Sequence, residues 1–395
     1  MISNSWERKG DSMVMEKTLR LNHGSMKAII PPRRTVEIKD YSIEDFKPSG
    51  NNLLDEWRIK RFSEYVTLQF PYWKRTGLKE ISLPELPHYK GLESVDELGI
   101  KVIDSLDFEG SDRKFVLLAD AFSLSGSYYV HSGVRTLVMQ DFDSIDNSLI
   151  IVERGRLDLI RIVQKELFVG NLRILLKPGT ELRLYNLYIG KGTDENSPLI
   201  SNVFVEAQEG SKLHVRDFYF GGTINAGYFG LRVNGENVYS DIRPYYLGAG
   251  KTVIDILYLV RFYAGNSYSN VDAKGVLTDK SKLIFRGIMD ITSGCKEAEA
   301  HQSNHALLLS EKAKVEAIPS LMVDEHEVVA SHAASSAPVD EQTVFYLMSR
   351  GIPRDEAIRM IVKGVFETLK DELNNLDDTL KLGGLIEDAL GSVVG

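Results

Sequence analysis

The order of apolar and polar residues changes character at two points along the chain. From about residue 116 to residue 334, short β-rich runs are separated by turns of Gly, Asn, Asp and Lys, and many runs alternate apolar with polar residues. Amphipathic helix periodicity is scarce across this region, which therefore predicts a succession of short strands. The clearest runs are residues 115–119, 149–152, 172–176, 182–185, 213–215, 253–257 and 283–285.

A weak repeat runs through the β-rich region. Four segments share a polar turn followed by an apolar–polar–apolar run, and their turns centre on Gly179, Gly210, Lys280 and Lys312. The turn residues are separated by 31 (210 − 179), 70 (280 − 210) and 32 (312 − 280) positions. A period near 31 with one unmatched interval is typical of the stacked coils of a β-solenoid. An ordinary β-sandwich, whose turns recur about every 8–12 residues, is the alternative.

The segment before this region, residues 42–95, is predicted to be mainly helical. Ser42 and Asp45 loosely fit a capping box at a helix start. Residues 1–40 are weakly patterned, and we expect partial order at best near Met1. Apolar residues recur at helical spacing at Trp57, Phe62, Tyr65 and Val66.

The segment after the β-rich region also has a helical pattern. Residues 340–351 end at Gly351, where a left-handed residue commonly closes a helix. An apolar side then extends from Ala357 to Leu369, and a shorter segment follows at 376–390. Such helices suit either a cap on the solenoid or a surface for a partner. The predicted division is a mainly helical N-terminal region (1–110), a β-helix core (111–335) and a C-terminal helical domain (336–395).

Composition and charge exclude several classes of function. The 395 residues carry a net charge of −9, which argues against nucleic acid as a principal ligand because phosphate binding needs a basic face. No window approaches 18 continuous apolar residues, and the N-terminus lacks the apolar stretch of a signal peptide. We therefore expect a cytoplasmic protein that does not enter a membrane. The single cysteine, Cys295, cannot form an internal disulfide or a zinc-ribbon site.

Four of the eight histidines fall within 32 residues (332 − 301 + 1): His301, His305, His326 and His332. Neutral imidazole is a good ligand for divalent metals. His301 and His305 are four apart, but residues four apart on a strand are ~13 Å from each other, too far to chelate one ion. His326 lies between two glutamates, for which a solvated polar face is the favoured interpretation. Cys295 lies beside Lys296 and is best interpreted as an incidental thiol.

An ordered set of motifs in residues 301–370 resembles the SufB/SufD family of the SUF iron–sulfur cluster assembly system. A weaker match is Trp73–Leu78, WKRTGL. The resemblance implies a right-handed parallel β-helix between N- and C-terminal helical regions, which favours the solenoid over the sandwich. The main motifs are NHALLLS (304–310), PSLMV (319–323), SHAA (331–334), DEQTVFYLMSRG (340–351) and the segment from Glu356 to Phe366.

Within this family the chain resembles SufD more than SufB. SufB-like members have a cysteine where this chain has Asn304, and carboxylates where it has Ser331 and Ala333. Only the histidine between those two positions, His332, is retained. The resemblance therefore implies that His332 is a candidate iron or cluster ligand at an interface whose other ligands come from a partner chain.

The resemblance further implies a non-catalytic subunit that pairs with a SufB-like scaffold, or with itself, and with a SufC-like ABC ATPase. Iron or a nascent iron–sulfur cluster would be held transiently and shared with the partner, with none tightly bound by this chain alone. Two alternatives stay open: a β-helix enzyme acting on polysaccharide, and a purely structural solenoid partner. The C-terminal residues expected to contact the ATPase are Phe345, Tyr346, Arg350, Ile358, Ile361, Val365 and Phe366.

Overall fold

The structure, a computed structural model, divides the chain into two units, residues 1–39 and 40–395. In the first unit, β1 (Ile2–Lys9), β2 (Ser12–Leu21) and β3 (Gly24–Ile29) form an antiparallel sheet in that order. These strands differ from the expectation of a mainly helical N-terminal region with little pattern near Met1; β2 contains no Gly or Pro, which suits a strand. The described residues are 2–9, 12–21, 24–29, 40–86, 88–89, 92, 94–376 and 382–394.

The second unit opens with short helices. The capping box at Ser42 is present: its hydroxyl accepts from the Glu44 amide, and the Asp45 carboxylate accepts from the Ser42 amide, at the start of η1 (Ile43–Asp45). In α1 (Asn52–Tyr65), Trp57, Phe62 and Tyr65 are buried as their spacing predicts, whereas Val66 follows the helix and is exposed. α2 (Glu97–Ser105) and α3 (Arg113–Phe122) follow.

The prediction that residues 115–119 form a strand is wrong. They lie in α3, which is capped by Asp112, whose side chain accepts a hydrogen bond from the Lys114 amide. Every residue of α3 from Lys114 to Phe122 is buried. A helix that is enclosed on all sides shows a continuous apolar run instead of one apolar stripe, and over five residues such a run cannot be distinguished from a strand.

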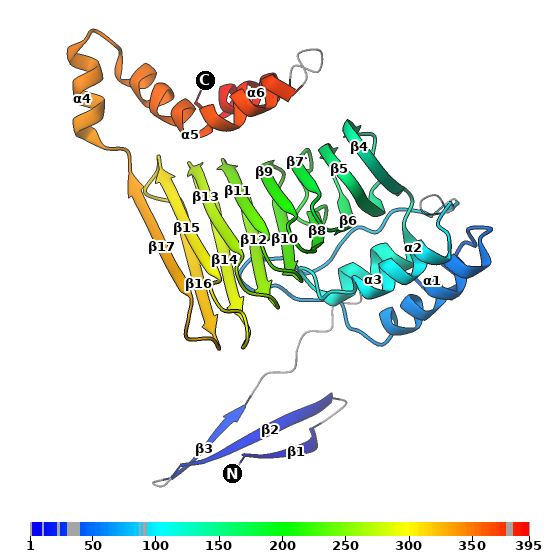
Figure 1. The fold of residues 1–395 in the computed structure, drawn as a ribbon. Coiled ribbons are helices and arrows are strands. Elements are labelled where there is room, and N and C mark those ends of the chain that lie inside the picture. Colours follow the sequence, from blue (N-terminus) through cyan, green and yellow to red (C-terminus); the bar gives the residue numbers. More distant parts are fainter. Residues whose placement is uncertain are drawn as a thin grey trace. The chain divides into compact units, whose positions relative to one another are not determined.

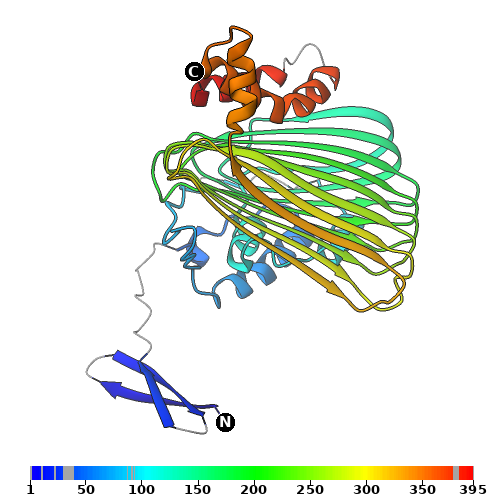
Figure 2. The ribbon, with the colours of Figure 1, turned by 90° about the vertical axis from the view of Figure 1, so that its left-hand side faces the viewer.

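Parallel strands then wind into a β-helix with two long sheets (Figures 1 and 2). The long strand β5 (Ile145–Lys165) belongs to both, because residues 145–152 pair with β6 and residues 156–165 pair with β7. Even-numbered strands continue one sheet and odd-numbered strands the other, so each coil contributes one strand to each sheet. The predicted parallel β-helix flanked by helices is confirmed. The strands are β4 (Tyr128–Met139), which pairs with β5, then β6 (Phe168–Leu176), β7 (Glu181–Gly190), β8 (Leu199–Ala207), β9 (Lys212–Gly221), β10 (Ile224–Val233), β11 (Tyr239–Gly248), β12 (Val253–Phe262), β13 (Tyr268–Leu277), β14 (Lys282–Ile291), β15 (Glu299–Leu308), β16 (Lys314–Val323) and β17 (Val329–Pro338).

The sequence repeat corresponds to the coils. Gly179 and Gly210 lie in turns that lead from an even to an odd strand, and the Gly179 amide donates to Glu209 in the next turn at 2.8 Å. Lys280 and Lys312 lie in turns on the other side, which lead from an odd to an even strand. Spacings of 31 and 32 are therefore single coils, and the unmatched interval of 70 crosses from one row of turns to the other.

The interior of the β-helix is mostly aliphatic and aromatic, but one polar chain is buried within it. Asn186 donates to Asp217 at 2.7 Å, and Tyr258 donates to the other oxygen of Asp217 at 2.5 Å. Arg161 donates to Asn186 at 3.3 Å. Burial raises the pKa of Asp217 to about 6, although the hydrogen bonds and the nearby guanidinium oppose the shift.

Of the three C-terminal helices, α5 (Arg354–Leu376) and α6 (Leu382–Val394) cover the outer face of the odd-numbered sheet, whereas α4 (Glu341–Ser349) packs against α5. Gly351 follows α4 with a positive φ of 88° as predicted. Phe366 on α5 packs edge-on against Phe218 of β9. One cluster joins the two helices to the sheet; it includes Val362, Phe366, Leu369, Leu373, Ile386 and Leu390 from the helices, and Ile160, Tyr185, Leu187, Phe218, Tyr245 and Leu247 from the strands.

Within the described part of the chain, the helices do not include one that has both the length and the apolar character needed to cross a membrane.

Candidate functional site

The β-helix ends at β16 and β17, each of which has only one neighbouring strand in its sheet. Residues of these strands are more exposed than those of preceding coils, because no further coil stacks on them. Apolar side chains are among those exposed: Met322 and Val323 end β16, and Val329 begins β17. This open end therefore combines free strand edges with uncovered apolar surface, as an association site would.

His332 belongs to the inward-facing row at this open end. On β15, Ala300, Gln302 and Asn304 are buried, whereas the residues between them are more exposed, so the even-numbered positions face the interior. His332 is the parallel partner of Gln302 in the next coil, so it continues the inward row. Because β17 is the last strand of its sheet, the His332 side chain is exposed. Its imidazole is thus available to a group that approaches the end of the β-helix.

His301 and His305 belong to the outward row of β15 and do not share a face with His332. The Nδ1 atom of His301 lies 2.8 Å from the Ser331 hydroxyl, and that of His305 lies 2.8 Å from the Ser335 hydroxyl. Each histidine therefore contacts the serine that is its register partner on β17.

His326 and its flanking glutamates lie in the turn between β16 and β17. The Glu325 carboxylate accepts from the amides of His326 and Gly294 at 2.8 and 3.0 Å, and these bonds lower its pKa. Such side-chain-to-backbone bonds are typical of turns and compete with a strand ladder. The acidic residues therefore stabilise a turn between stacked coils.

Cys295 lies in the turn between β14 and β15, and its side chain is fully buried in the interior cluster. Its Sγ atom lies 3.5 Å from the Thr292 hydroxyl. A buried cysteine in such surroundings packs as a small apolar side chain. Across the described ranges, no group of three or more His, Cys, Asp or Glu side chains is arranged to hold a metal ion.

The free edge of β17 can be assigned residue by residue. The Val329 amide donates to the carbonyl of Ala298, the residue just before β15, at 3.0 Å, and successive amides alternate sides along a strand. The amides of His332 and Ala334 consequently point away from β15, toward the open edge. β17 reads VASHAASSAP, so apart from Val329 and His332 its side chains are those of Ala, Ser and Pro. Small side chains on both faces allow another strand to approach closely.

The residues expected to contact a partner divide into two groups. On α4, Phe345 and Tyr346 are 72% and 57% exposed, and the Arg350 guanidinium lies over the Tyr346 ring. Met348 on the same helix is also exposed, and the sequence analysis missed it although it lies three positions after Phe345, on the same side of the helix. On α5, Phe366 is buried against the β-helix, and Ile358, Ile361 and Val365 are partly buried.

Comparison with known proteins identifies the middle of the chain. A family model described as "SUF system FeS cluster assembly, SufBD core domain" matches residues 138–365. A segment of 139 residues is 37% identical to the iron–sulfur cluster assembly protein SufD of Bacillus subtilis, covering 35% of this chain and 32% of that protein.

Two further relatives agree. A segment of 140 residues is 38% identical to an iron–sulfur cluster assembly SufBD family protein of Pyrococcus horikoshii, covering 35% of this chain and 30% of that protein. A segment of 159 residues is 27% identical to the iron–sulfur cluster assembly protein SufD of Escherichia coli, covering 39% of this chain and 38% of that protein. The matched segments thus span about a third of the length of these relatives.

Proposed function

The chain belongs to the SufBD family of SUF iron–sulfur cluster assembly proteins, and on that premise we propose that it is a SufD-type, non-catalytic subunit of a cytoplasmic assembly complex. Its cargo is iron or a nascent iron–sulfur cluster. The observation that carries the proposal is the position of His332, exposed in the inward row at the open end of the β-helix.

In the proposed mechanism, His332 supplies one ligand of a site that a second chain completes. Imidazole binds Fe(II) through a neutral nitrogen, and a single such bond releases its metal readily. The position equivalent to the family's cysteine is Asn304, which is 1% exposed and accepts a hydrogen bond from the Tyr246 hydroxyl at 3.1 Å. An amide held in this way has no sulfur to offer, so thiolate ligands come from the partner.

The partner joins through the edge of β17. Strand addition would satisfy the free amides of His332 and Ala334 and cover the apolar residues Met322, Val323 and Val329. A SufB-like chain, or a second copy of this chain, has the parallel β-helix that such an edge fits. Because His332 lies on the joining strand, association and completion of the metal site occur together.

The ABC ATPase docks on α4. Exposed aromatic side chains, such as Phe345 and Tyr346 on α4, are frequent anchors in protein interfaces. α4 is connected directly to β17, and Arg354 at the start of α5 forms a bidentate pair with Glu341 of α4 at 2.7 Å. A movement of α4 driven by ATP would therefore act on the strand that carries His332.

Co-expression tests this assembly. The chain is produced with a SufB-like protein and a SufC-like ATPase from one organism, with the tag on the ATPase only. The proposal expects the chain to co-purify in a stable complex that acquires an iron–sulfur cluster on reconstitution. Absence of the chain from the purified complex would contradict the proposal.

A further inference from the structure

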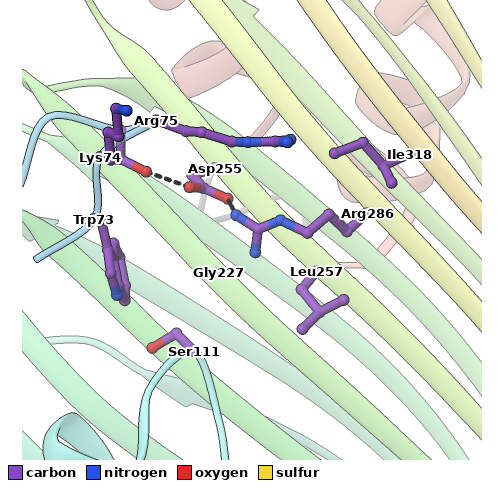
Figure 3. Close-up of a pocket in the computed structure, with 10 residues that line it drawn as sticks. Trp73, Lys74, Arg75, Ser111, Gly227, Asp255, Leu257, Arg286 and Ile318 are labelled. Carbon is purple, nitrogen blue, oxygen red and sulfur yellow. Dashed lines mark hydrogen bonds and ion pairs between the residues drawn. The ribbon is translucent and has the colours of Figure 1, made fainter. Parts of the chain in front are cut away.

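A pocket of about 360 Å³ lies between the N-terminal region and the outer face of the even-numbered sheet. One wall comes from residues 73–76 and Ser111, and the other from β10, β12, β14 and β16. Figure 3 shows the Trp73 indole and the Arg286 guanidinium facing the pocket from opposite sides, with Ser111 and Leu257 near them. The volume falls within the range of sites for small organic ligands.

The aromatic wall is held in place. The Trp73 amide donates to Leu78 at 3.0 Å, and the Gly77 amide donates back to Trp73 at 2.8 Å, which closes a tight turn. The Trp73 ring packs edge-on against Phe115 of α3, with ring centroids 5.3 Å apart. Gly77 adopts a φ of +88°, which only glycine takes without strain. Trp73 thus offers a fixed, half-buried surface to a flat group, with Leu257 and Ile318 as further apolar lining.

The charged groups of the lining favour an anion. Three cations line the pocket (Lys74, Arg75 and Arg286) against one carboxylate, Asp255. Both oxygens of Asp255 are already engaged, one by the Thr76 hydroxyl and one by Arg286. Since Arg286 donates to Asp255 through one terminal nitrogen, its other N–H groups stay available for an anion.

Two further groups in the pocket lack partners. The Ser111 hydroxyl is buried and has no hydrogen-bond partner among the described residues. An unsatisfied buried hydroxyl costs free energy that a bound acceptor would recover. Within the described part of the chain, no ion pair involves Lys74, whereas Arg75 lies 3.4 Å from Glu316. The pocket is therefore bordered by a buried hydroxyl without a partner and by an exposed lysine that forms no ion pair with the described residues.

From these observations we propose that the pocket binds a small organic anion with a flat ring. The ring lies against Trp73 and Leu257, and a phosphate or carboxylate group accepts hydrogen bonds from Arg286 and Ser111, with Lys74 adding positive charge. Arginine suits this role because its planar fork can donate two parallel bonds to a phosphate or carboxylate. From the open end, Ile318 on β16 lines this pocket, whereas neither His332 nor any residue of α4 does.

Three probes separate the two halves of the proposed ligand. 1-Naphthyl phosphate has a ring and an anion, 1-naphthol has the ring alone, and inorganic phosphate has the anion alone. Binding to the full-length chain is followed by isothermal titration calorimetry. The proposal expects saturable binding of 1-naphthyl phosphate, at least about tenfold tighter than either of the other probes, because each half contributes separately.

Variants tie the binding to this pocket. Arg286→Gln and Trp73→Leu should each weaken binding of 1-naphthyl phosphate about tenfold or more. Arg261→Gln is the matched control, because Arg261 on β12 forms the same kind of cross-strand pair with Asp290 but does not line the pocket. Lys74→Ala separates loss of binding from loss of folding. Because Lys74 is exposed, this substitution should weaken binding of 1-naphthyl phosphate without lowering the melting temperature.

Three outcomes would overturn the proposal. One is the absence of saturable 1-naphthyl phosphate binding to the wild-type chain. Another is equal weakening by Arg261→Gln and Arg286→Gln, which would locate the ligand elsewhere. The third is equally tight binding of inorganic phosphate and 1-naphthyl phosphate. That result would mean that the pocket binds anions alone and that Trp73 does not contribute to binding.

Discussion

Arg216 on β9 donates from Nε to the Glu372 carboxylate on α5 at 2.7 Å, and from a terminal nitrogen to Asp241 on β11 at 2.9 Å. The Arg216 side chain is only 6% exposed, and its pKa is raised by these carboxylates despite the opposing effect of burial. The ion pair between Arg216 and Glu372 fixes α5 to the β-helix beside the aromatic contact of Phe366 with Phe218.

Glu372→Gln should loosen α5 from the sheet. It removes one of the two anions that balance a buried guanidinium, and a destabilisation of about 1–3 kcal/mol is expected. Hydrogen exchange followed by mass spectrometry should show faster exchange in α5 and α6 than in the β-helix. Glu367→Gln is the control, because Glu367 is half exposed and pairs with Lys370 at the surface. Equal exchange in the two variants would mean that the Arg216 pair does not hold the helix.

Asp217→Asn should change the pH dependence of stability. The raised pKa of about 6 means that the folded chain binds this proton more tightly than the unfolded chain, whose pKa is near the ordinary 3.8. The contribution of protonated Asp217 is therefore complete below about pH 4 and is lost as pH rises through about 6. Asparagine cannot ionise, so the variant avoids a loss of up to ~3 kcal/mol.

The melting temperatures of Asp217→Asn and of the wild type are measured at about pH 4.5 and about pH 7, and the wild-type value is subtracted from that of the variant. The difference should become more positive at the higher pH. Asp194→Asn, at an exposed turn position, should show no such trend. A difference that is constant with pH would refute a raised pKa at Asp217.

Phe345→Ala and Tyr346→Ala should each weaken association with the ABC ATPase by about tenfold or more, since truncation of an aromatic anchor commonly costs ~2 kcal/mol at an interface. The melting temperature of the isolated chain should not fall, because both side chains are mostly exposed. Surface plasmon resonance with immobilised ATPase measures the change, and Gln342→Ala on the same helix serves as control. Unchanged affinity in both aromatic variants would remove α4 from the interface.

Much of this architecture follows from the sequence, and the exceptions have physical causes. Coil spacing is readable at Gly179 and Gly210 because stacked turns must repeat with the coil. The helix at residues 115–119 could not be predicted, because a helix that is buried on every side lacks the polar stripe by which a helix is recognised. Phe366 illustrates a related limit: an apolar helical stripe indicates burial, but it does not say whether the covering surface is the chain's own β-helix or a partner.

Part of the candidate site could also be predicted from the sequence. His332 could be selected by its motif, but its inward position depends on the register with Gln302, which one-residue changes in turn length would reverse. The pocket at Trp73 joins residues separated by more than 200 positions, Trp73 and Arg286, and no local pattern predicts that proximity.

Ala334→Pro tests strand addition at β17. The amide of Ala334 points to the free edge, so proline removes a donor that a partner strand needs without removing a bond to β15. The fold already accommodates Pro319 within the other edge strand, β16. Analytical ultracentrifugation should show weaker association with the SufB-like chain, while the melting temperature changes little. Full association by a stably folded variant would mean that the partner does not add to this edge.

His332→Ala addresses the central claim most directly. The complex with the SufB-like chain and the ATPase is reconstituted with iron and sulfide, and cluster content is quantified by absorption and Mössbauer spectroscopy. His326→Ala is the matched control, an exposed histidine in the turn beside the same open end. The account predicts an intact complex that loses most of its cluster in His332→Ala and keeps it in His326→Ala. A normal cluster content in His332→Ala would contradict it and leave the chain a structural role only.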